Sequence, residues 1–480
     1  MSQTPSATDS DGAGVLSQRQ VVFMVAALVL SVISFQLNAT MLGPAFYDIE
    51  TELGKGSFAA MSTYFYLAGA VANVVLIRWS DYIGRKRVLL AIMALLCVGT
   101  VLCVVGTSLP VVLAGRVMQG ACNVTFGLAF LIMRERLSGA TFGVCCGVVT
   151  SVNGGVAGVD ALLGGFLADR FGYRSIFMLI LVIGVGGIAF GWRAVPSDEP
   201  GRTASGRMDW VGAALIGLGV AALILFISSG GDSGWSSPLA LTFIVVAIVA
   251  LALLVMFEKR VAEKRVATPL VDIDQMRSRY AWPLIAATTL NMASFMVIVG
   301  FIILKIAEDP DSGFGLDGTT TAVLFLTPGA VVQLITAPLI GRLAVRIGFV
   351  TVLRAGIVGS IAVTALLAVF AQNRSALILL MAALGCAFMG VTLTAMSVLG
   401  VTQAPEGKPG SLPGISNAAF GVGSSIGFAW AGPVVGSGTV GSFTTALWIC
   451  AAIGVVALGF SLVLRPRALE TGPTVVAVAH

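Results

Sequence analysis

The sequence of 480 residues is poor in charge, because Asp, Glu, Lys and Arg together make up 11% of it, whereas 57% is hydrophobic. A soluble protein of this length needs more charged side chains to cover its surface, so the composition favours an integral membrane protein. Histidine is almost missing, since the single one, His480, is the last residue. A nucleophile–histidine catalytic arrangement is therefore lacking, and no enzyme is expected. The sequence also lacks a GxxxxGK[ST] phosphate-binding loop, so an ATP-driven pump is not expected.

Paired or clustered cysteines are also lacking. The seven cysteines all fall within apolar stretches, and none forms a CxxC motif. This placement predicts neither a disulfide framework nor a metal site. No cofactor is expected.

Long apolar runs dominate what is present. A helix needs about 20 predominantly apolar residues to span a bilayer, and fourteen such stretches follow one another along the chain. They predict an all-α polytopic membrane protein with two six-helix bundles and two inserted transmembrane helices between them. The predicted divisions are a polar tail 1–19, a bundle 20–195, a linker 196–208, the inserted helices 209–257, a basic linker 258–280 with an amphipathic helix, a bundle 281–465 and a tail 466–480.

The basic residues are distributed unevenly between alternate loops. With the N-terminus inside and fourteen spans, 22 of the 28 lysines and arginines fall on the inside, and one, Arg116, falls within a span. This asymmetry follows the positive-inside rule, which predicts a cell (inner) membrane protein with both termini cytoplasmic. The net charge of +5 is then a signal of topology, and no nucleic-acid partner is expected. The outside receives Lys55, Arg170, Arg174, Lys305 and Arg374.

A short internal repeat links the two outer blocks. The loop after the second span reads IRWSDYIGRKRVLL, and the loop after the tenth reads IGRLAVRIGFVTVLRAG. Aligning Gly84 with Gly348 also pairs Arg78 with Arg342. Parallel six-helix repeats with a binding site between them near the midplane are a known transporter architecture.

Three segments carry a resemblance to a known family. Ile77–Arg87 keeps the acid, the second glycine and the basic run of a G-x-L-A-D-R-x-G-R-K/R signature, Leu113–Gly127 keeps a fourth-helix signature, and Gly154–Phe177 keeps part of a fifth-helix antiporter signature. The chain thus resembles the major facilitator superfamily, and its two extra helices are similar to the fourteen-helix drug:proton antiporters. The resemblance implies a major facilitator fold. It also implies a conformational latch between the halves at Asp81, Gly84, Arg85, Lys86 and Arg87, the alternative being a simple positive-inside anchor.

Three positions depart from the antiporter pattern. The family's first-helix acid is replaced by Asn38, and Asp160 and Ala161 stand where the fifth-helix signature has Gly-Pro. Whether protons are coupled is therefore left open by the sequence.

Asp160 is the only acidic residue placed well inside a predicted span, so it is the leading candidate for proton coupling. In the hairpin of the fourth and fifth spans, Arg116 lies within two residues of the same level, about 3 Å along the axis. We expect Arg116 and Asp160 at similar depth, where they could form a pair that protonation or substrate breaks. The alternatives are a permanent structural ion pair, or an arginine satisfied by carbonyl groups.

Two further sets of residues complete the prediction. Polar or aromatic side chains on the predicted inner helices are candidates to line a substrate cavity, and glycines at helical spacing form small faces for close helix packing or sliding, the alternative being ordinary packing. The cavity candidates are Gln36, Asn38, Gln119, Asn123, Asn291, Gln333 and Trp430. The small-face candidates are Gly154, Gly158, Gly164, Gly165, Gly423 and Gly427.

The expected function is secondary transport, with proton-coupled export of drugs or other small hydrophobic compounds as the leading version. A specific metabolite facilitator or proton-linked uptake transporter is the alternative within transport, and a membrane sensor that does not translocate is the alternative of another class. The expected partners are a small-molecule substrate, protons and the lipid bilayer, and a monomer is the default.

Overall fold

In the computed structural model, the described residues are 17–137, 139–198, 208–264, 277–403, 411–436 and 438–465. Within them every regular element is a helix, and thirteen helices are long and apolar enough to span a membrane. Helix α7 (Gly139–Phe171), of 33 residues, stands at the predicted fifth span. The all-α polytopic architecture is therefore confirmed. The predicted tail 466–480 and most of the predicted tail 1–19 lie outside the described residues, as do parts of both linkers.

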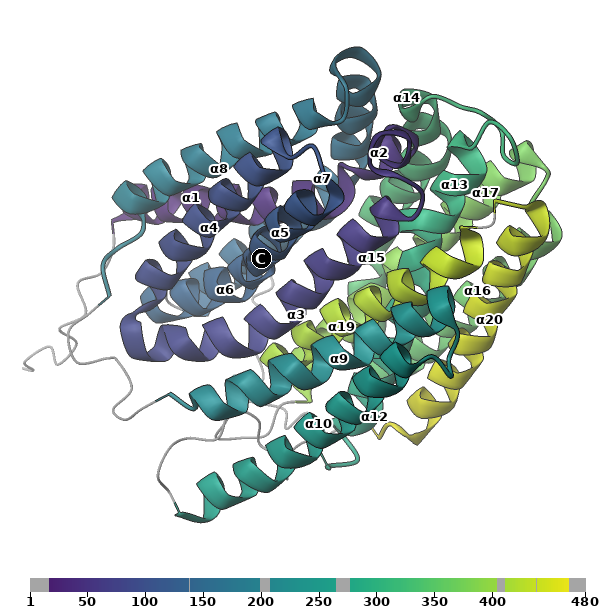
Figure 1. Ribbon diagram of the computed structural model, residues 1–480. Helices are drawn as coiled ribbons and strands as arrows, with labels where there is room; N and C mark the ends of the chain where they lie inside the picture. The colour runs from purple at the N-terminus through teal and green to yellow at the C-terminus, as the bar shows by residue number, and fades with distance from the viewer. Residues whose placement is uncertain are drawn as a thin grey trace, which may run out of the picture.

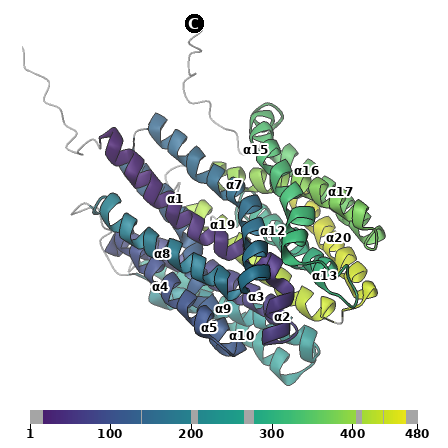
Figure 2. The ribbon, with the colours of Figure 1, turned by 90° about the horizontal axis from the view of Figure 1, so that it is seen from above.

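The N-terminal helices form one side of the molecule (Figure 2). Each span is a continuous apolar run, and the fourth is interrupted by a short 3₁₀ turn. A short helix after the first span lies at one end of the bundle. The elements are α1 (Gln18–Thr40), η1 (Gly43–Ala45), α2 (Phe46–Leu53), α3 (Ser57–Ile83), α4 (Arg85–Val105), α5 (Leu109–Gly120), η2 (Ala121–Asn123), α6 (Val124–Arg136), α7 and α8 (Arg174–Ala194).

The C-terminal helices form the other side (Figure 2). Three of their spans contain π-helical turns. Such turns leave backbone groups out of the regular α-helical pattern and are frequent at functional sites. The elements are α12 (Trp282–Asn291), η3 (Met292–Met296), η4 (Ile298–Ile302), α13 (Ile303–Glu308), α14 (Gly318–Thr321), η5 (Ala322–Leu326), α15 (Thr327–Ile347), α16 (Phe349–Val369), α17 (Arg374–Leu384), η6 (Gly385–Thr392), α18 (Leu393–Thr402), α19 (Ser411–Val435) and α20 (Val440–Val463).

The inserted helices α9 (Trp210–Ser233) and α10 (Pro238–Lys264) form a hairpin that lies across the seam between the two sides (Figure 1). Helix α9 packs on both α3 and α19, where Ile224 meets Leu67 and Ala429 in a small apolar cluster. Since α10 continues to Lys264, the first residues of the predicted basic linker belong to this helix rather than to a separate one. The remainder of the predicted amphipathic segment lies outside the described residues.

The repeat seen in the sequence has a structural counterpart. Gly84 separates α3 from α4 with φ 101°, and Gly348 separates α15 from α16 with φ 89°. Both values lie where residues with a Cβ are strained. Each half thus makes the same sharp turn after its second span.

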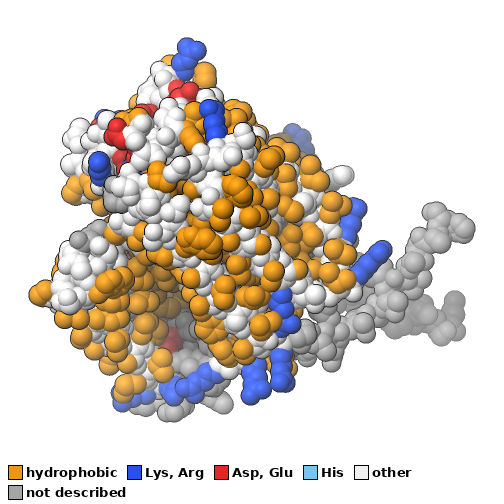
Figure 3. Space-filling model, turned by 90° about the vertical axis from the view of Figure 1, so that its right-hand side faces the viewer, with side chains coloured by type: hydrophobic (Ala, Val, Ile, Leu, Met, Phe, Trp, Pro, Cys, Tyr) orange, Lys and Arg blue, Asp and Glu red, His pale blue; other side chains and the backbone are white. Residues whose placement is uncertain are grey.

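The two ends of the molecule differ in charge. Figure 3 shows both acidic and basic side chains at the top of the view, whereas basic side chains predominate along the bottom, and hydrophobic side chains cover much of the surface between them. This distribution suits a protein whose belt faces lipid. We call the end formed by residues 43–53 and 309–321 the α2 end.

Candidate functional site

Arg116 on α5 is the centre of a buried polar cluster, with 3% of its surface exposed. Its Nη1 donates to Gln119 Oε1 at 2.9 Å and to Asn38 Oδ1 at 3.3 Å. Its Nη2 donates to the Asn38 carbonyl at 3.3 Å, and its Nε donates to the Met61 carbonyl at 3.5 Å. The guanidinium carbon lies 4.2 Å from the centre of the Phe65 ring. Four of the five donors of this guanidinium are therefore used.

Asp160 on α7 is equally buried, with 2% of its surface exposed, but it belongs to a different set of contacts. The Thr40 hydroxyl, at the end of α1, lies 2.5 Å from Asp160 Oδ2 and 2.9 Å from the Gln36 carbonyl. The other carboxyl oxygen, Oδ1, has no hydrogen-bond partner among the described residues. A hydroxyl has one proton, so it can donate either to the carboxylate or to the carbonyl.

The expected Arg116–Asp160 pair is therefore not formed in this structure. Of the alternatives that the sequence leaves open, an arginine satisfied by carbonyl groups describes Arg116 better. The side-chain amides of Asn38 and Gln119 also accept its hydrogen bonds. The partners Asn38 and Thr40 are two residues apart on α1, about 3 Å along the axis. The two charged residues thus contact neighbouring levels of the same helix, as their spacing in the hairpin predicts. That spacing does not fix the direction in which either side chain leaves its helix.

The other cavity candidates are distributed over both halves. Gln36 donates to the Thr40 hydroxyl at 3.1 Å, and Asn123 accepts from Asn73 at 3.1 Å. In the C-terminal half, Trp430 donates to the Ala293 carbonyl in η3 at 3.1 Å. The amide oxygens of two further candidates in this half, Asn291 and Gln333, have no hydrogen-bond partner among the described residues.

An aromatic cluster that the sequence reading did not identify joins the two halves. The Tyr66 ring, on α3, stacks on Phe428, on α19, with centroids 5.8 Å apart and planes 14° apart. Phe301 of η4 stacks on Phe58 of α3 at 6.2 Å and contacts Phe428 at 6.2 Å. Aromatic residues in apolar spans are too frequent to signal such a cluster, which only the helix arrangement shows.

The predicted latch residues bind within the N-terminal half. Asp81 pairs with Arg78 at 3.3 Å and with Arg85 at 3.5 Å, and Arg85 pairs with Glu135 of α6 at 2.9 Å. The backbone N–H groups of Arg85 and Lys86 donate to Asp198 at 2.8 and 3.3 Å.

All contacts described for Asp81, Arg85 and Lys86 thus stay within residues 78–198, and Arg87 is exposed. In this conformation the loop ties α3, α4 and α6 together rather than latching the halves. Asp198 is a further residue that the sequence gave no reason to select, because it lies in a predicted linker.

The predicted glycine faces have distinct neighbours. A Cβ at Gly423 would lie 2.3 Å from the Thr289 carbonyl oxygen, and one at Gly427 would lie 2.9 Å from that of Ala293, both within the C-terminal half. A Cβ at Gly164 would lie 2.2 Å from the Met41 carbonyl oxygen, whereas one at Gly165 would meet Gly318 across the seam. Gly154 and Gly158 lie in α7, but their surroundings are outside the described side chains.

The halves are joined by polar contacts near the α2 end. Lys305 pairs with Glu50 across the seam at 3.3 Å and with Asp309 at 3.1 Å. Tyr47 N–H donates to Glu308 at 3.0 Å, and the Gly318 N–H donates to Asp169 at 3.1 Å. The sequence predicts Lys305 among the basic residues of the outside and gives no reason to select these acids, whereas α13 continues as a helix to Glu308.

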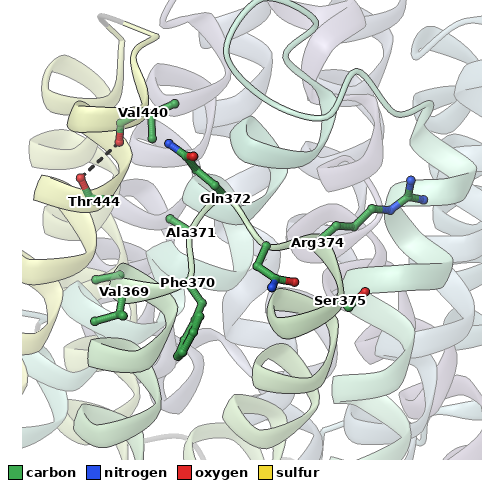
Figure 4. A pocket seen from close by; sticks show the side chains of 10 residues that line it. Val369, Phe370, Ala371, Gln372, Arg374, Ser375, Val440 and Thr444 are labelled. Carbon is green, nitrogen blue, oxygen red and sulfur yellow. Dashed lines mark hydrogen bonds between the residues drawn. The ribbon is translucent and has the colours of Figure 1, made fainter.

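The surface of the described residues is hollowed in at least two places. One, of about 770 Å³, lies at the α2 end between the halves and is lined by Glu308 and Asp169 among others. The second, of about 500 Å³, lies between the ends of α16, α17 and α20 (Figure 4). In it the Thr444 hydroxyl donates to the Val440 carbonyl at 3.2 Å, and none of the predicted site residues lines it.

The sequence of the chain also has known relatives. The chain matches the sequence model of the Major Facilitator Superfamily over residues 28–257, 204–428 and 284–477. It is 31% identical over 419 residues to the uridine/deoxyuridine transporter of Lactococcus lactis, covering 85% of this chain and 86% of that protein. It is 26% identical over 411 residues to the multidrug resistance protein Stp of Mycobacterium tuberculosis, covering 83% and 73%.

Solved structures agree on the fold. The xylose transporter XylE from E. coli, in a partially occluded inward-open conformation, superposes with a TM-score of 0.63 at 13% identity, over 94% of this chain and 98% of that one. The nucleoside transporter NupG superposes with a TM-score of 0.59 at 16% identity, over 94% and 100%. The multi-pass helical architecture, the repeated turn and the sequence matches lead to one conclusion: the chain belongs to the major facilitator superfamily of membrane transporters.

Proposed function

We propose that this secondary transporter moves a small, neutral, ring-containing metabolite of the nucleoside class across the cell membrane by alternating access, and that Asp160 carries the coupled proton. Its termini face the cytoplasm in this proposal, so the α2 end faces outside, and the conformation described above is closed to the outside.

The observation that carries the proposal is the separation of Asp160 from Arg116. A buried carboxyl group without a cation is stable in an apolar surrounding when it holds a proton. The Thr40 hydroxyl beside it can donate to the carboxylate or, when the carboxyl is protonated, to the Gln36 carbonyl. Loading and release of a proton thus changes a hydrogen bond on α1, the helix that also contacts Arg116.

The chemistry of the other groups favours a neutral substrate. Arg116 has one N–H left to offer, so it is poorly placed to bind an anion. The amides of Asn291 and Gln333 have oxygens free of partners among the described residues, and Tyr66 and Trp430 supply flat rings. Rings and a few amides suit a compound with a heterocycle and hydroxyl groups. The similarity to a uridine/deoxyuridine transporter supports this class.

Export of drugs is the second candidate function. It is supported by the similarity to the multidrug resistance protein Stp and by the apolar, aromatic cluster between the halves. The two candidates differ in what competes for the site, because a drug exporter tolerates lipophilic cations whereas a nucleoside transporter requires hydroxyl and base groups.

The test is transport by purified protein in sealed vesicles that contain a pH-sensitive dye. Labelled uridine and a lipophilic cation are each added to the wild type and to Asp160→Asn. We expect uridine to move with protons in the wild type, and proton movement to be lost in the variant. Thr141→Ser on α7 is the control for a conservative change on the same helix.

Movement of the lipophilic cation but not of uridine would transfer the proposal to drug export. Uridine movement with an unchanged proton signal in Asp160→Asn would overturn the role of this acid.

A further inference from the structure

Each half supplies an acidic side chain to the beginning of a helix in the other half at the α2 end. Asp169, at the end of α7, accepts hydrogen bonds from the backbone N–H groups of Gly318 and Thr319, where α14 begins, at 3.1 and 2.9 Å. Glu308, at the end of α13, accepts one from the N–H of Tyr47, where α2 begins, at 3.0 Å. The closed end is thus held by two reciprocal helix caps.

The two carboxyl groups differ in burial and in how many of their oxygens accept hydrogen bonds. Asp169 uses both carboxyl oxygens, and the Thr319 hydroxyl also bonds to it. Glu308 is 4% exposed, and only Oε2 has a partner, whereas Oε1 is buried with no hydrogen-bond partner among the described residues. Glu308 also lines the cavity of about 770 Å³ between the halves. It is therefore a buried carboxyl group with an unsatisfied oxygen beside a cavity.

The groups that face Glu308 are mainly acidic. Asp48 from α2, Asp169 from α7 and Asp317 from the segment before α14 act on Glu308, and Tyr47 and Arg170 also line its cavity. Lys305 and Asp309 are its neighbours in the chain and pair with each other. Lys305 is engaged by Glu50 and Asp309. Within the described part of the chain, no group of acidic, histidine or cysteine side chains is arranged to hold a metal ion. A proton is then the occupant that the site suits.

We propose that Glu308 is a second proton-binding site, that it is loaded from the outside when the α2 end is open, and that the loaded proton permits the end to close. Closing brings Asp48 and Asp169 of one half to Glu308 and Asp317 of the other. An ionised Glu308 is repelled by three carboxylates and buries a charge with a single N–H as partner, whereas the protonated group avoids both costs. Acid outside therefore favours the closed end, and an ionised Glu308 favours the open one.

This inference rests on the proposed function for its orientation and for the use of protons. In the transport cycle, a proton taken up by Glu308 accompanies the change from the outward-open to the inward-open state. Asp160 and Glu308 then have separate roles. Asp160 lies beside α1 in the N-terminal bundle, whereas Glu308 lies at the contact between the halves that closes the α2 end, which we call the seal.

The test measures opening of the seal directly. Thr321 is fully buried one turn inside the beginning of α14, and its hydroxyl has no partner among the described residues, so Thr321→Cys is a mild reporter. In cells, a membrane-impermeant maleimide is applied at external pH values from about 5.5 to about 8.5, and labelling is counted above that of the parent protein. Lys55→Cys, at an exposed position beside the seal, corrects for the pH dependence of the thiol itself.

We expect the corrected rate of Thr321→Cys to rise about tenfold between the two pH limits, because ionised Glu308 opens the end. With Glu308→Gln added, the rate should stay low at every pH. With Glu308→Asp, the pH dependence should be retained. A rate that is independent of pH with Glu308 intact, or that keeps its pH dependence in Glu308→Gln, overturns the inference.

The outcomes separate this inference from the proposed function, since labelling requires neither substrate nor Asp160. pH-dependent labelling together with no proton movement in vesicles would sink the proposed coupling and leave Glu308 as a pH-sensitive seal. Normal proton-coupled transport together with labelling that ignores Glu308 would sink only the inference.

Discussion

Arg116 lies over the ring of Phe65, with its guanidinium carbon 4.2 Å from the ring centre, and Asp160 is not one of its partners. A cation over an aromatic face is stabilised by the ring quadrupole, most strongly where water is excluded. The planar fork of the guanidinium at the same time spans Asn38 and Gln119. Arg116 thereby connects α5 to α1 and α3, and this connection does not need the charge of Asp160.

Arg116→Lys should keep the positive charge but lose the planar set of guanidinium donors. An ammonium group cannot reach Asn38, Gln119 and Met61 at once or stack flat on Phe65. Hydrogen bonds to charged groups contribute about 1.5–3 kcal/mol each, so we expect a lower thermal unfolding temperature in detergent and the loss of most transport. Arg78→Lys, at a partly exposed position, is the control and should unfold like the wild type. Equal stability of the two variants would contradict a structural role for the guanidinium geometry.

Thr40→Val should alter the pH dependence of transport, whereas Thr40→Ser should not. Valine has nearly the same shape but no hydroxyl to donate to Asp160 or to the Gln36 carbonyl. Without this donor the carboxylate is less stable, so the pH of half-maximal transport should move upward. Initial rates at a series of pH values check this expectation. A Thr40→Val profile that overlays the wild type would show that the hydroxyl plays no part in proton release.

The sequence predicted the buried charges but not their partners. An apolar run that contains Arg116 or Asp160 shows that the residue is in a span, since such residues are rare there. Spacing from the hairpin turn gives the level of each residue. The partner depends on how each helix is rotated, which neither composition nor spacing fixes. Thr40 and Phe65 were missed for this reason, because neither residue type is unusual in a membrane helix.

Lys305→Met should open the α2 end. Lys305 lies between Glu50 and Asp309 with 8% of its side chain exposed, so its removal leaves two buried acids facing each other. We expect faster labelling of Thr321→Cys than in the parent. The double variant Glu50→Gln with Lys305→Met removes one acid as well and should restore slow labelling in part. Labelling of Thr321→Cys at the parent rate in Lys305→Met would show that the ion pair does not hold the seal.

The ion pair of Lys305 with Asp309 should lose its effect on the α2 end in strong acid. Partial burial raises the pKa of Asp309, but hydrogen bonds from Lys305 and from the backbone N–H groups of Asp311 and Ser312 outweigh this, and the pKa lies below its ordinary value. A lowered pKa means that the stabilisation is present near neutral pH and is lost as the pH falls toward the lowered value. Thr321→Cys labelling should therefore rise again below about pH 4, where Asp carboxylates ordinarily begin to protonate. Asp309→Asn should lack this second rise.

Gly84→Ala should destabilise the protein more than Gly348→Ala does. Both glycines have positive φ, so alanine costs about 1–2 kcal/mol of backbone strain at either position. At Gly84 a new Cβ would also lie 2.3 Å from the carboxylate of Asp198, whereas at Gly348 the nearest atom is 3.9 Å away. The difference between the two unfolding temperatures thus measures the Asp198 cap on α4. The double variant Gly84→Ala with Asp198→Ala should then unfold at a temperature close to that of Gly348→Ala.

Gly164 and Gly165 on α7 distinguish an effect on folding stability from an effect on opening of the α2 end. A Cβ at Gly164 would lie 2.2 Å from the Met41 carbonyl oxygen, in the same half, so Gly164→Ala strains the half in every conformation. A Cβ at Gly165 would lie 2.7 Å from backbone atoms of Gly318 and Thr319, in the other half, so Gly165→Ala clashes only when the α2 end is closed.

We therefore expect Gly164→Ala to lower the thermal unfolding temperature and to leave Thr321→Cys labelling slow. Gly165→Ala should unfold near the wild-type temperature and label faster. Overpacking costs about 1–3 kcal/mol, which corresponds to a shift of about fivefold to a hundredfold in the ratio of open to closed protein. If both variants were destabilised with unchanged labelling, Gly165 would be an ordinary packing residue. Faster labelling of Gly165→Ala alone would show that the close approach of α7 to α14 is made and broken during transport.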